Sequence, residues 1–200
     1  MQDVYENNFF ALLARQDTLA PEAKRLFLLA ALKGRLAMCQ WLHEAVEPIT
    51  NLGAAYALSM AAENGHVLVC KWLYATFQIA PPEVAVSALQ MAAHGGHVSV
   101  CAWLHATYGL TAEEARGSGA LLLAFSRGHL NVCQWLLAAF DMPVEDARAY
   151  DDEALIAAVA RGHLGVCQWY HETCTAVPDW SSFVQHASPE AAAWIRDLTS

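Results

Sequence analysis

Apolar and polar positions follow a pattern that returns every 31 to 34 residues along the chain. Each return contains a glycine, and apolar residues stand at the second, fourth, fifth, seventh, eighth and twelfth positions after it. The third, sixth and tenth positions hold small or polar residues, with Leu68 as the exception. With about 100° between successive helical residues, these positions form a wide dry face and a narrow wet one, as in a helix packed between neighbours. The pattern predicts such a helix after each of Gly34, Gly65, Gly96, Gly128 and Gly162.

A second, shorter apolar run precedes each glycine. The runs cover residues 26–31, 57–62, 88–93, 120–124 and 154–159. In the first three units the run ends in an Ala-Ala pair, which lets two helices approach closely. Because glycine tolerates positive φ at a helix end, it supplies the turn. Each unit is therefore predicted to be two helices joined by a glycine turn.

The two ends of the chain differ from the middle, as the capping units of a repeat array do. Residues 1–20 are similar to the second helix of a truncated first unit. Residues 179–200 keep Trp194 in register, and Ser188 and Pro189 suit the N-cap and first position of a helix. We predict an all-α helical repeat solenoid that fills residues 1–200 as one domain, with five full repeats between two partial capping repeats.

The fullest form of the unit is Ala-Ala-x-x-Gly-His-[Leu/Val]-x-Val-Cys-x-Trp-Leu, which resembles the ankyrin repeat. A leucine such as Leu58 or Leu89 stands seven residues before the glycine, where that family has the leucine of its Thr-Pro-Leu-His motif; the rest of this motif is absent. The Cys-x-Trp-Leu ending is most similar to divergent ankyrin arrays expanded in large DNA viruses and some protists. The resemblance covers essentially the whole chain and implies an ankyrin-like solenoid that recognises proteins.

The segments that precede the first helices depart from this family, because its Gly-Ala-Asp hairpin signature is missing. Pro81, Thr111 and Pro143 open these segments instead, and Thr111 has capping-box spacing to Glu114. We therefore predict that short helical turns stand where a standard ankyrin repeat has a β-hairpin finger.

Composition and charge exclude several classes of function. The chain carries 11 basic and 20 acidic residues, whereas binding to nucleic acid or to anionic membranes needs a basic surface. No apolar run approaches the roughly 18 residues of a membrane-spanning helix, and the residues after Met1 do not form a signal peptide. We expect a partner that is neither nucleic acid nor membrane.

Five of the six cysteines recur at one position of the unit. Neighbouring helices pack about 8–10 Å apart, whereas a disulfide needs Cα atoms within about 7 Å. We therefore interpret the cysteines as small buried residues. Free thiols predict an intracellular, reducing compartment, either cytoplasm or nucleus, which would be that of the host if the source is viral. The recurring residues are Cys39, Cys70, Cys101, Cys133 and Cys167.

A histidine stands four residues before the cysteine in four units, so the pair could offer two zinc ligands. The richest set is His163, Cys167, His171 and Cys174. A structural zinc site needs four converging ligands, but on a straight helix this set spans about 16 Å. We interpret the histidines as residues that cap the second helix or pack at its start, and we expect no metal or other cofactor.

The recurring tryptophans are expected to bury their rings between repeats rather than to form a ladder for ligands. The sequence contains no nucleophile elbow, P-loop or dinucleotide-binding glycine motif. We therefore expect no enzymatic activity.

The two positions before each glycine vary from unit to unit, and in ankyrin proteins this pair lines the concave face and contacts the partner. The pairs are locally more basic than the chain, which favours an acidic partner segment. The leading hypothesis is a non-enzymatic protein–protein interaction scaffold, monomeric or weakly homo-oligomeric. The alternatives are a structural, self-associating protein, and metal or small-molecule binding through the His/Cys ladder. The predicted contacts are Leu32, Lys33, Glu63, Asn64, His94, Ser126, Arg127 and Arg161.

Overall fold

A computed structural model describes residues 19–45, 49–79, 82–148, 152–174 and 178–199. All regular structure within these ranges is helical, which confirms the predicted all-α repeat solenoid. The expected N-terminal cap, residues 1–20, lies outside the described residues except for Leu19 and Ala20. These two residues begin the first helix of the first full repeat rather than ending a cap.

Each of the five marker glycines joins a first helix to a second helix. The first helices are α2 (Leu19–Leu32), α4 (Asn51–Glu63), α6 (Pro82–Gly95), α9 (Ala120–Ser126) and α11 (Glu153–Ala160). The second helices are α3 (Leu36–Ala45), α5 (Val67–Phe77), α7 (Val98–Tyr108), α10 (Leu130–Phe140) and α12 (Leu164–Thr173).

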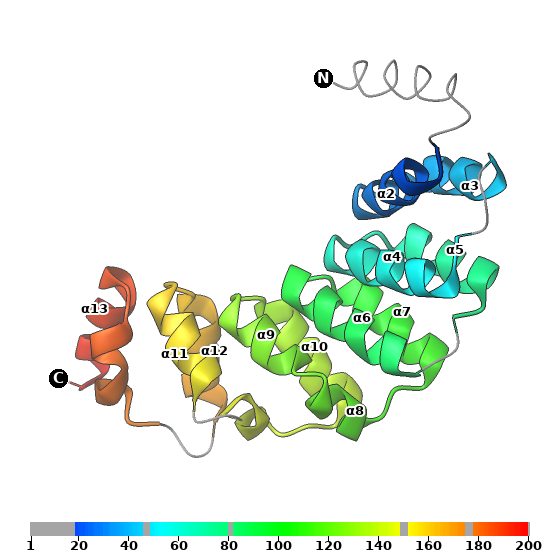
Figure 1. The fold of residues 1–200 in the computed structure, drawn as a ribbon. Coiled ribbons are helices and arrows are strands. Elements are labelled where there is room, and N and C mark those ends of the chain that lie inside the picture. Colours follow the sequence, from blue (N-terminus) through cyan, green and yellow to red (C-terminus); the bar gives the residue numbers. More distant parts are fainter. Residues whose placement is uncertain (1–18, 46–48, 80–81, 149–151, 175–177, 200) are drawn as a thin grey trace.

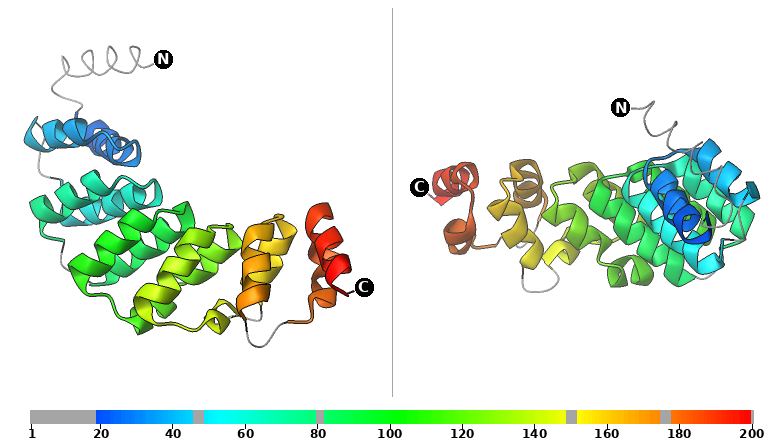
Figure 2. Two further views of the ribbon diagram at one scale, coloured as in Figure 1. Left: turned by 180° about the vertical axis from the view of Figure 1, so that it is seen from behind. Right: turned by 45° about the horizontal axis from the view of Figure 1, so that its top comes forward.

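The helix pairs stack into a curved array. Each first helix contacts the first helix of the next unit, and α3, α5, α7 and α10 form the corresponding row of second helices. Figure 1 shows the glycine turns along the inner edge of the curve, with α8 (Ala112–Gly117) and η2 (Val144–Arg148) along the outer edge. The same order of pairs is visible from behind and from above (Figure 2). Within the described ranges, no helix is long and apolar enough to cross a membrane.

The glycine turn has the same hydrogen bonds in every unit. In the third unit, the Gly96 N–H donates to the Ala93 carbonyl and the His97 N–H donates to the Ala92 carbonyl. This pair of bonds is the Schellman motif, which requires a residue with positive φ at the helix end. Gly96 has a φ of +84°, in the region that only glycine adopts without strain. The Ala-Ala pair therefore provides two turn acceptors as well as close helix contact.

The core is a thin layer between the two rows of helices. In α5, Val69, Cys70 and Leu73 are buried, and the matching residues of the other second helices are buried too, except at the start of α3. The leucine seven residues before each glycine is also buried, with Phe27 in its place in the first unit. These positions are the dry face that the sequence pattern predicts.

Among the described residues, the predicted short helical turns are found in the fourth and fifth units, as α8 and η2. Thr111 caps α8 with the complete capping box that its spacing to Glu114 predicts. In the third unit, the segment from Pro82 is continuous with α6, so the expectation of a separate turn there is wrong. The reason is length: the fourth unit is one residue longer than the third, and Gly119, with a φ of +69°, breaks the helix at this point.

The C-terminal unit is a cap made of η3 (Trp180–His186) and α13 (Pro189–Thr199). The Ser188 hydroxyl accepts a hydrogen bond from the Ala191 N–H, which confirms that Ser188 is the N-cap of α13. Trp194 packs against Trp180 with ring centroids 4.9 Å apart. These aromatic contacts cover the open end of the last full repeat.

Candidate partner-binding groove

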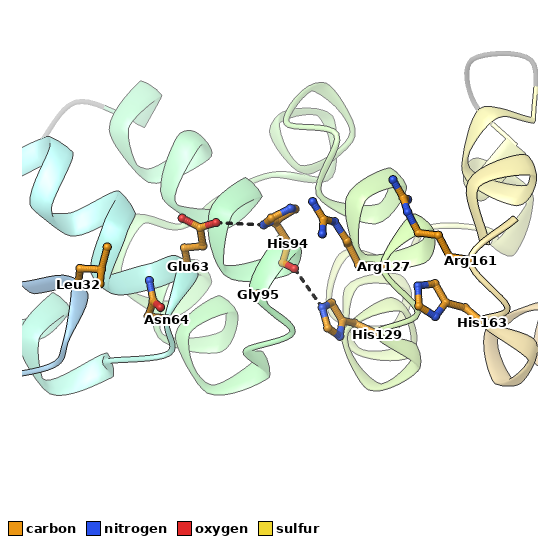
Figure 3. A pocket seen from close by; sticks show the side chains of 9 residues that line it. All are labelled: Leu32, Glu63, Asn64, His94, Gly95, Arg127, His129, Arg161 and His163. Atoms are coloured by element: carbon orange, nitrogen blue, oxygen red, sulfur yellow. Dashed lines mark hydrogen bonds and ion pairs between the residues drawn. The ribbon is translucent and has the colours of Figure 1, made fainter.

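A groove of about 650 Å³ runs along the glycine turns on the inner edge of the array. Six of the eight predicted contact residues line it, and they come from five successive units. We call this surface the turn groove, and Figure 3 shows its side chains in a row. Its residues are Leu32, Glu63, Asn64, His94, Gly95, Arg127, His129, Arg161 and His163.

The ends of the first helices position these side chains. Leu32 and Glu63 are the last residues of α2 and α4, while Arg127 and Arg161 are the C-caps of α9 and α11. Because each Schellman turn fixes the two preceding residues in the same way, equivalent positions in successive units face the same groove. The repeat thus places variable side chains on an invariant backbone.

Histidines tie each unit to the one before it. The His66 ring donates a hydrogen bond from Nε2 to the Leu32 carbonyl at 3.0 Å, and the His129 ring donates one to the His94 carbonyl at the same distance. Each ring also lies against the glycine of the preceding turn; a Cβ on Gly34 would stand 2.5 Å from Nδ1 of His66. The histidine of one repeat therefore leaves room only for glycine in the turn of the repeat before it.

The prediction that these histidines cap the second helix or pack at its start is confirmed in part. His66 and His129 pack at the start of their helices, as predicted, but neither makes a side-chain cap to its own helix. Their polar atoms reach the preceding unit instead. Sequence reasoning did not select His129 and His163 as groove residues, because it assigned all histidines at this position to the helix start.

Two predicted contact residues do not line the groove. Lys33 is exposed beside it, whereas Ser126 is buried, with its hydroxyl donating to the Leu123 carbonyl. Ser126 contributes through its backbone, because its carbonyl accepts a hydrogen bond from Nη1 of Arg161 at 2.8 Å. Gly95 lines the groove without having been predicted. A Cβ there would collide with the Glu63 carbonyl oxygen, so glycine allows close approach of α6 to α4.

Charge is unevenly distributed along the groove. Near its middle, Glu63 of the second unit contacts His94 of the third, with Oε1 and Nδ1 3.2 Å apart (Figure 3). Towards its C-terminal end, Arg127 is exposed and has no ion pair or hydrogen-bond partner among the described side chains. Burial lowers the pKa of His163, and the charges of Arg161 and Arg127 lower it further. The lowered pKa favours the neutral form of His163, whereas the two arginines carry positive charge.

The cysteine ladder is structural. All six cysteines are free and buried, and burial raises the pKa of the Cys70, Cys101, Cys133 and Cys167 thiols to about 12. No three His, Cys, Asp or Glu side chains converge on a metal-sized site in the described ranges. At the C-terminal set, His171 instead accepts a hydrogen bond from the Trp180 indole N–H, and the Cys174 thiol lies 3.2 Å from the Tyr170 hydroxyl.

These raised pKa values predict slow thiol labelling of the native protein. At pH 8 a thiol of pKa about 12 is ionised in roughly one molecule in 10,000, and only the thiolate attacks a disulfide reagent. We expect the five ladder cysteines to react with a chromogenic disulfide no faster than the protein opens. All six should react at once in guanidinium chloride, which serves as the control. Immediate labelling of five thiols without denaturant would contradict their buried placement.

The recurring tryptophans pack between repeats, as predicted. Trp72 of the second unit lies 5.9 Å from His43 of the first, and Trp103 lies 6.1 Å from Tyr74, measured between ring centroids. Trp135 contacts His105 in the same way. All these tryptophans are partly buried against the core, so their rings join the repeats on the second-helix side, away from the glycine turns.

Comparison with known proteins agrees with this geometry. Residues 89–171 match the family model for ankyrin repeats, in three copies. This segment is similar to ankyrin repeats. The matched segment begins in α6 and ends in α12, so it covers most of the third unit and the fourth and fifth. A search of curated proteins found no match. Ankyrin repeats generally mediate protein–protein interaction and are typically non-enzymatic, so the kind of partner expected for this chain is a protein.

Proposed function

We propose that this protein is a non-enzymatic scaffold that binds an acidic segment of a partner protein in the turn groove. The observation that carries the proposal is the placement of Arg127 and Arg161 on successive ankyrin repeats, both exposed and both lining the groove. A guanidinium group binds a carboxylate through two parallel hydrogen bonds, which gives both affinity and orientation. Two such groups one repeat apart favour a partner with two neighbouring acidic side chains.

The chemistry of the groove supports binding rather than catalysis. None of its nine lining residues is a serine, threonine, cysteine or lysine, so none of them offers a hydroxyl, thiol or amine nucleophile. Its carboxylate, Glu63, contacts the His94 ring of the next repeat, with Oε1 and Nδ1 3.2 Å apart. His129 donates to a backbone carbonyl of the preceding repeat. These polar groups hold the repeats together.

The setting in which the scaffold acts is part of the same proposal. Six free, buried cysteines fit a reducing intracellular compartment, in which disulfides are rare. The formal charge of −9 opposes binding to nucleic acid. We propose a protein that is monomeric or a weak homo-oligomer, and for a viral source we propose that the partner is a host protein.

Charge reversal in the groove tests this function. The double variant R127E/R161E should lose the partner, because two attractive ion pairs become two repulsive ones. We expect binding at least about tenfold weaker, which corresponds to roughly 1.4 kcal/mol. Wild-type and variant proteins would be compared as baits in the native cell extract, with captured proteins quantified by mass spectrometry and any confirmed partner then titrated directly.

The matched control is K71E/R196E, which makes the same charge change at exposed positions that do not line the groove. Partners lost with R127E/R161E but retained with the control are groove partners. Their binding should weaken as salt concentration rises, because salt screens exposed charges. If both variants captured the same proteins as the wild type, the turn groove would not be the binding site. Circular dichroism would verify that each variant is folded.

A further inference from the structure

A second hollow, of about 570 Å³, adjoins the turn groove. It lies over α2 and α4 and is mainly apolar, and we call it the apolar hollow. Leu32 lines both hollows, so they form one continuous surface. The residues of the apolar hollow are Glu22, Arg25, Leu26, Leu28, Leu29, Leu32, Tyr56 and Met60.

Large apolar side chains are exposed to solvent in the apolar hollow. Leu29 is 43% exposed and Tyr56 is 57% exposed, although both are large and largely hydrophobic. Leu52, on the same helix as Tyr56, is 82% exposed. Neighbouring exposed apolar residues on a protein surface mark sites of interaction. One unit further along, Ser87 stands in the place of Tyr56, so the exposed aromatic ring is not repeated there.

The combined surface therefore changes character along the array. Its N-terminal end, over α2 and α4, is apolar, whereas Arg127 and Arg161 at the other end are positively charged. Between the two ends, the Glu63 carboxylate lies 3.2 Å from Nδ1 of His94. A partner that matches this surface needs apolar side chains at one end and carboxylates at the other.

We propose that the apolar hollow and the turn groove together form one binding surface for an extended peptide segment with bulky apolar residues at one end and two acidic residues at the other. This inference rests on the proposed function, since it assigns the partner of the same groove. The charge complementarity of the arginine end and the continuity through Leu32 carry it.

Repeat spacing sets the length of such a segment. Leu32 and Arg127 belong to the first and fourth units, three steps apart, and each step is about 8–10 Å, the distance between packed helices. The apolar and acidic ends should thus be about 25–30 Å apart. An extended chain advances about 3.3 Å per residue, so about eight or nine residues separate the two ends. Arg127 and Arg161 are one step apart, which places the two acidic residues about three positions from each other.

Synthetic peptides test this inference with the full-length protein. The two-ended probe has two bulky apolar residues, a Gly/Ser spacer of about eight residues and two glutamates three positions apart, made in both chain directions. An acid-only and an apolar-only peptide replace one end with Gly/Ser. We expect the better two-ended probe to bind at least about tenfold more tightly than either one-ended peptide, by fluorescence anisotropy.

Protein variants assign each end of the peptide to its hollow. L29S/Y56S should bind the two-ended and acid-only peptides equally, because it lacks only the apolar contact. R127E/R161E should bind the two-ended and apolar-only peptides equally. The matched controls are L68S, at a leucine that is 65% exposed on α5, and K71E/R196E; both should retain the wild-type preference.

The outcomes separate this inference from the proposed function. If R127E/R161E loses acidic peptides and captured partners while L29S/Y56S binds every ligand as the wild type does, the scaffold function stands and the two-ended surface is wrong. If R127E/R161E changes nothing, both are wrong. Failure of the two-ended probe to bind at millimolar concentration would also overturn the inference. So would a dimer, measured by sedimentation, that L29S/Y56S dissociates, because a second copy would then cover the apolar hollow.

Discussion

Gly96→Ala should destabilise the protein by about 2–5 kcal/mol. An alanine at a φ of +84° is strained by about 1–2 kcal/mol. Its Cβ would also stand 2.7 Å from Nδ1 of His129, a ring held in place by its hydrogen bond to the His94 carbonyl. Relieving this overlap requires a shift between the third and fourth repeats, at the typical overpacking cost of about 1–3 kcal/mol. Denaturant unfolding followed by circular dichroism measures the change.

Two other glycines are matched controls for Gly96. Gly109→Ala keeps the backbone strain, with a φ of +62°, but no atom lies within 4 Å of the new Cβ, so we expect a loss of only about 1–2 kcal/mol. Gly165→Ala has neither strain nor a close neighbour and lies within α12, where alanine is favoured by about 0.5–1 kcal/mol. A loss at Gly96 no larger than that at Gly109 would show that the histidine contact adds nothing.

Leu89→Ala should cost a similar amount, about 2–5 kcal/mol. Leu89 is fully buried in α6, in the middle of the array. Truncation removes its burial and leaves a cavity that helices on both sides cannot fill without moving. In a repeat array a weakened central unit also breaks the coupling between the two ends. We therefore expect a lower unfolding midpoint and a broader transition than in the wild type.

Leu68→Ala is the control for this core variant. Leu68 lies on α5 and is 65% exposed, so the same chemical change should alter stability by no more than about 0.5 kcal/mol. Equal effects at Leu68 and Leu89 would contradict the placement of the core. Thermal scans of both variants at one protein concentration provide an independent comparison.

Much of the fold could be predicted from the sequence because the same pattern of apolar positions around a glycine occurs in five units. A single cysteine or glycine in a sequence does not predict burial or a turn. Cysteines and glycines that recur at the same position of five units do, and Cys70 is buried and Gly65 has a positive φ. The capping box at Thr111 was also predictable, since it depends on residues three positions apart. Local chemistry and periodicity thus determined the helices, the turns and the core.

Contacts between units were harder to predict. His129 lines the turn groove because its ring reaches the His94 carbonyl, 35 positions earlier in the chain, and nothing in the local pattern shows this direction. Ser126 occupies a variable position, yet its helix ends so that the side chain turns inward. The break at Gly119 depends on how one extra residue is accommodated between α8 and α9. These features arise from the packing of one unit on the next.

The histidine contacts all run from one unit to the unit before it, and a serine replaces the histidine at the C-terminal cap. Each of the first four glycine turns contacts a histidine ring of the following unit, so an internal unit presents its glycine to one neighbour and its histidine to the other. After Gly162 the inserted residue is Ser188, whose N–H donates to the Val159 carbonyl while its hydroxyl caps α13. Duplication of an internal unit would therefore lengthen the groove by one repeat, and the added junction would use the same contact between a glycine and a histidine.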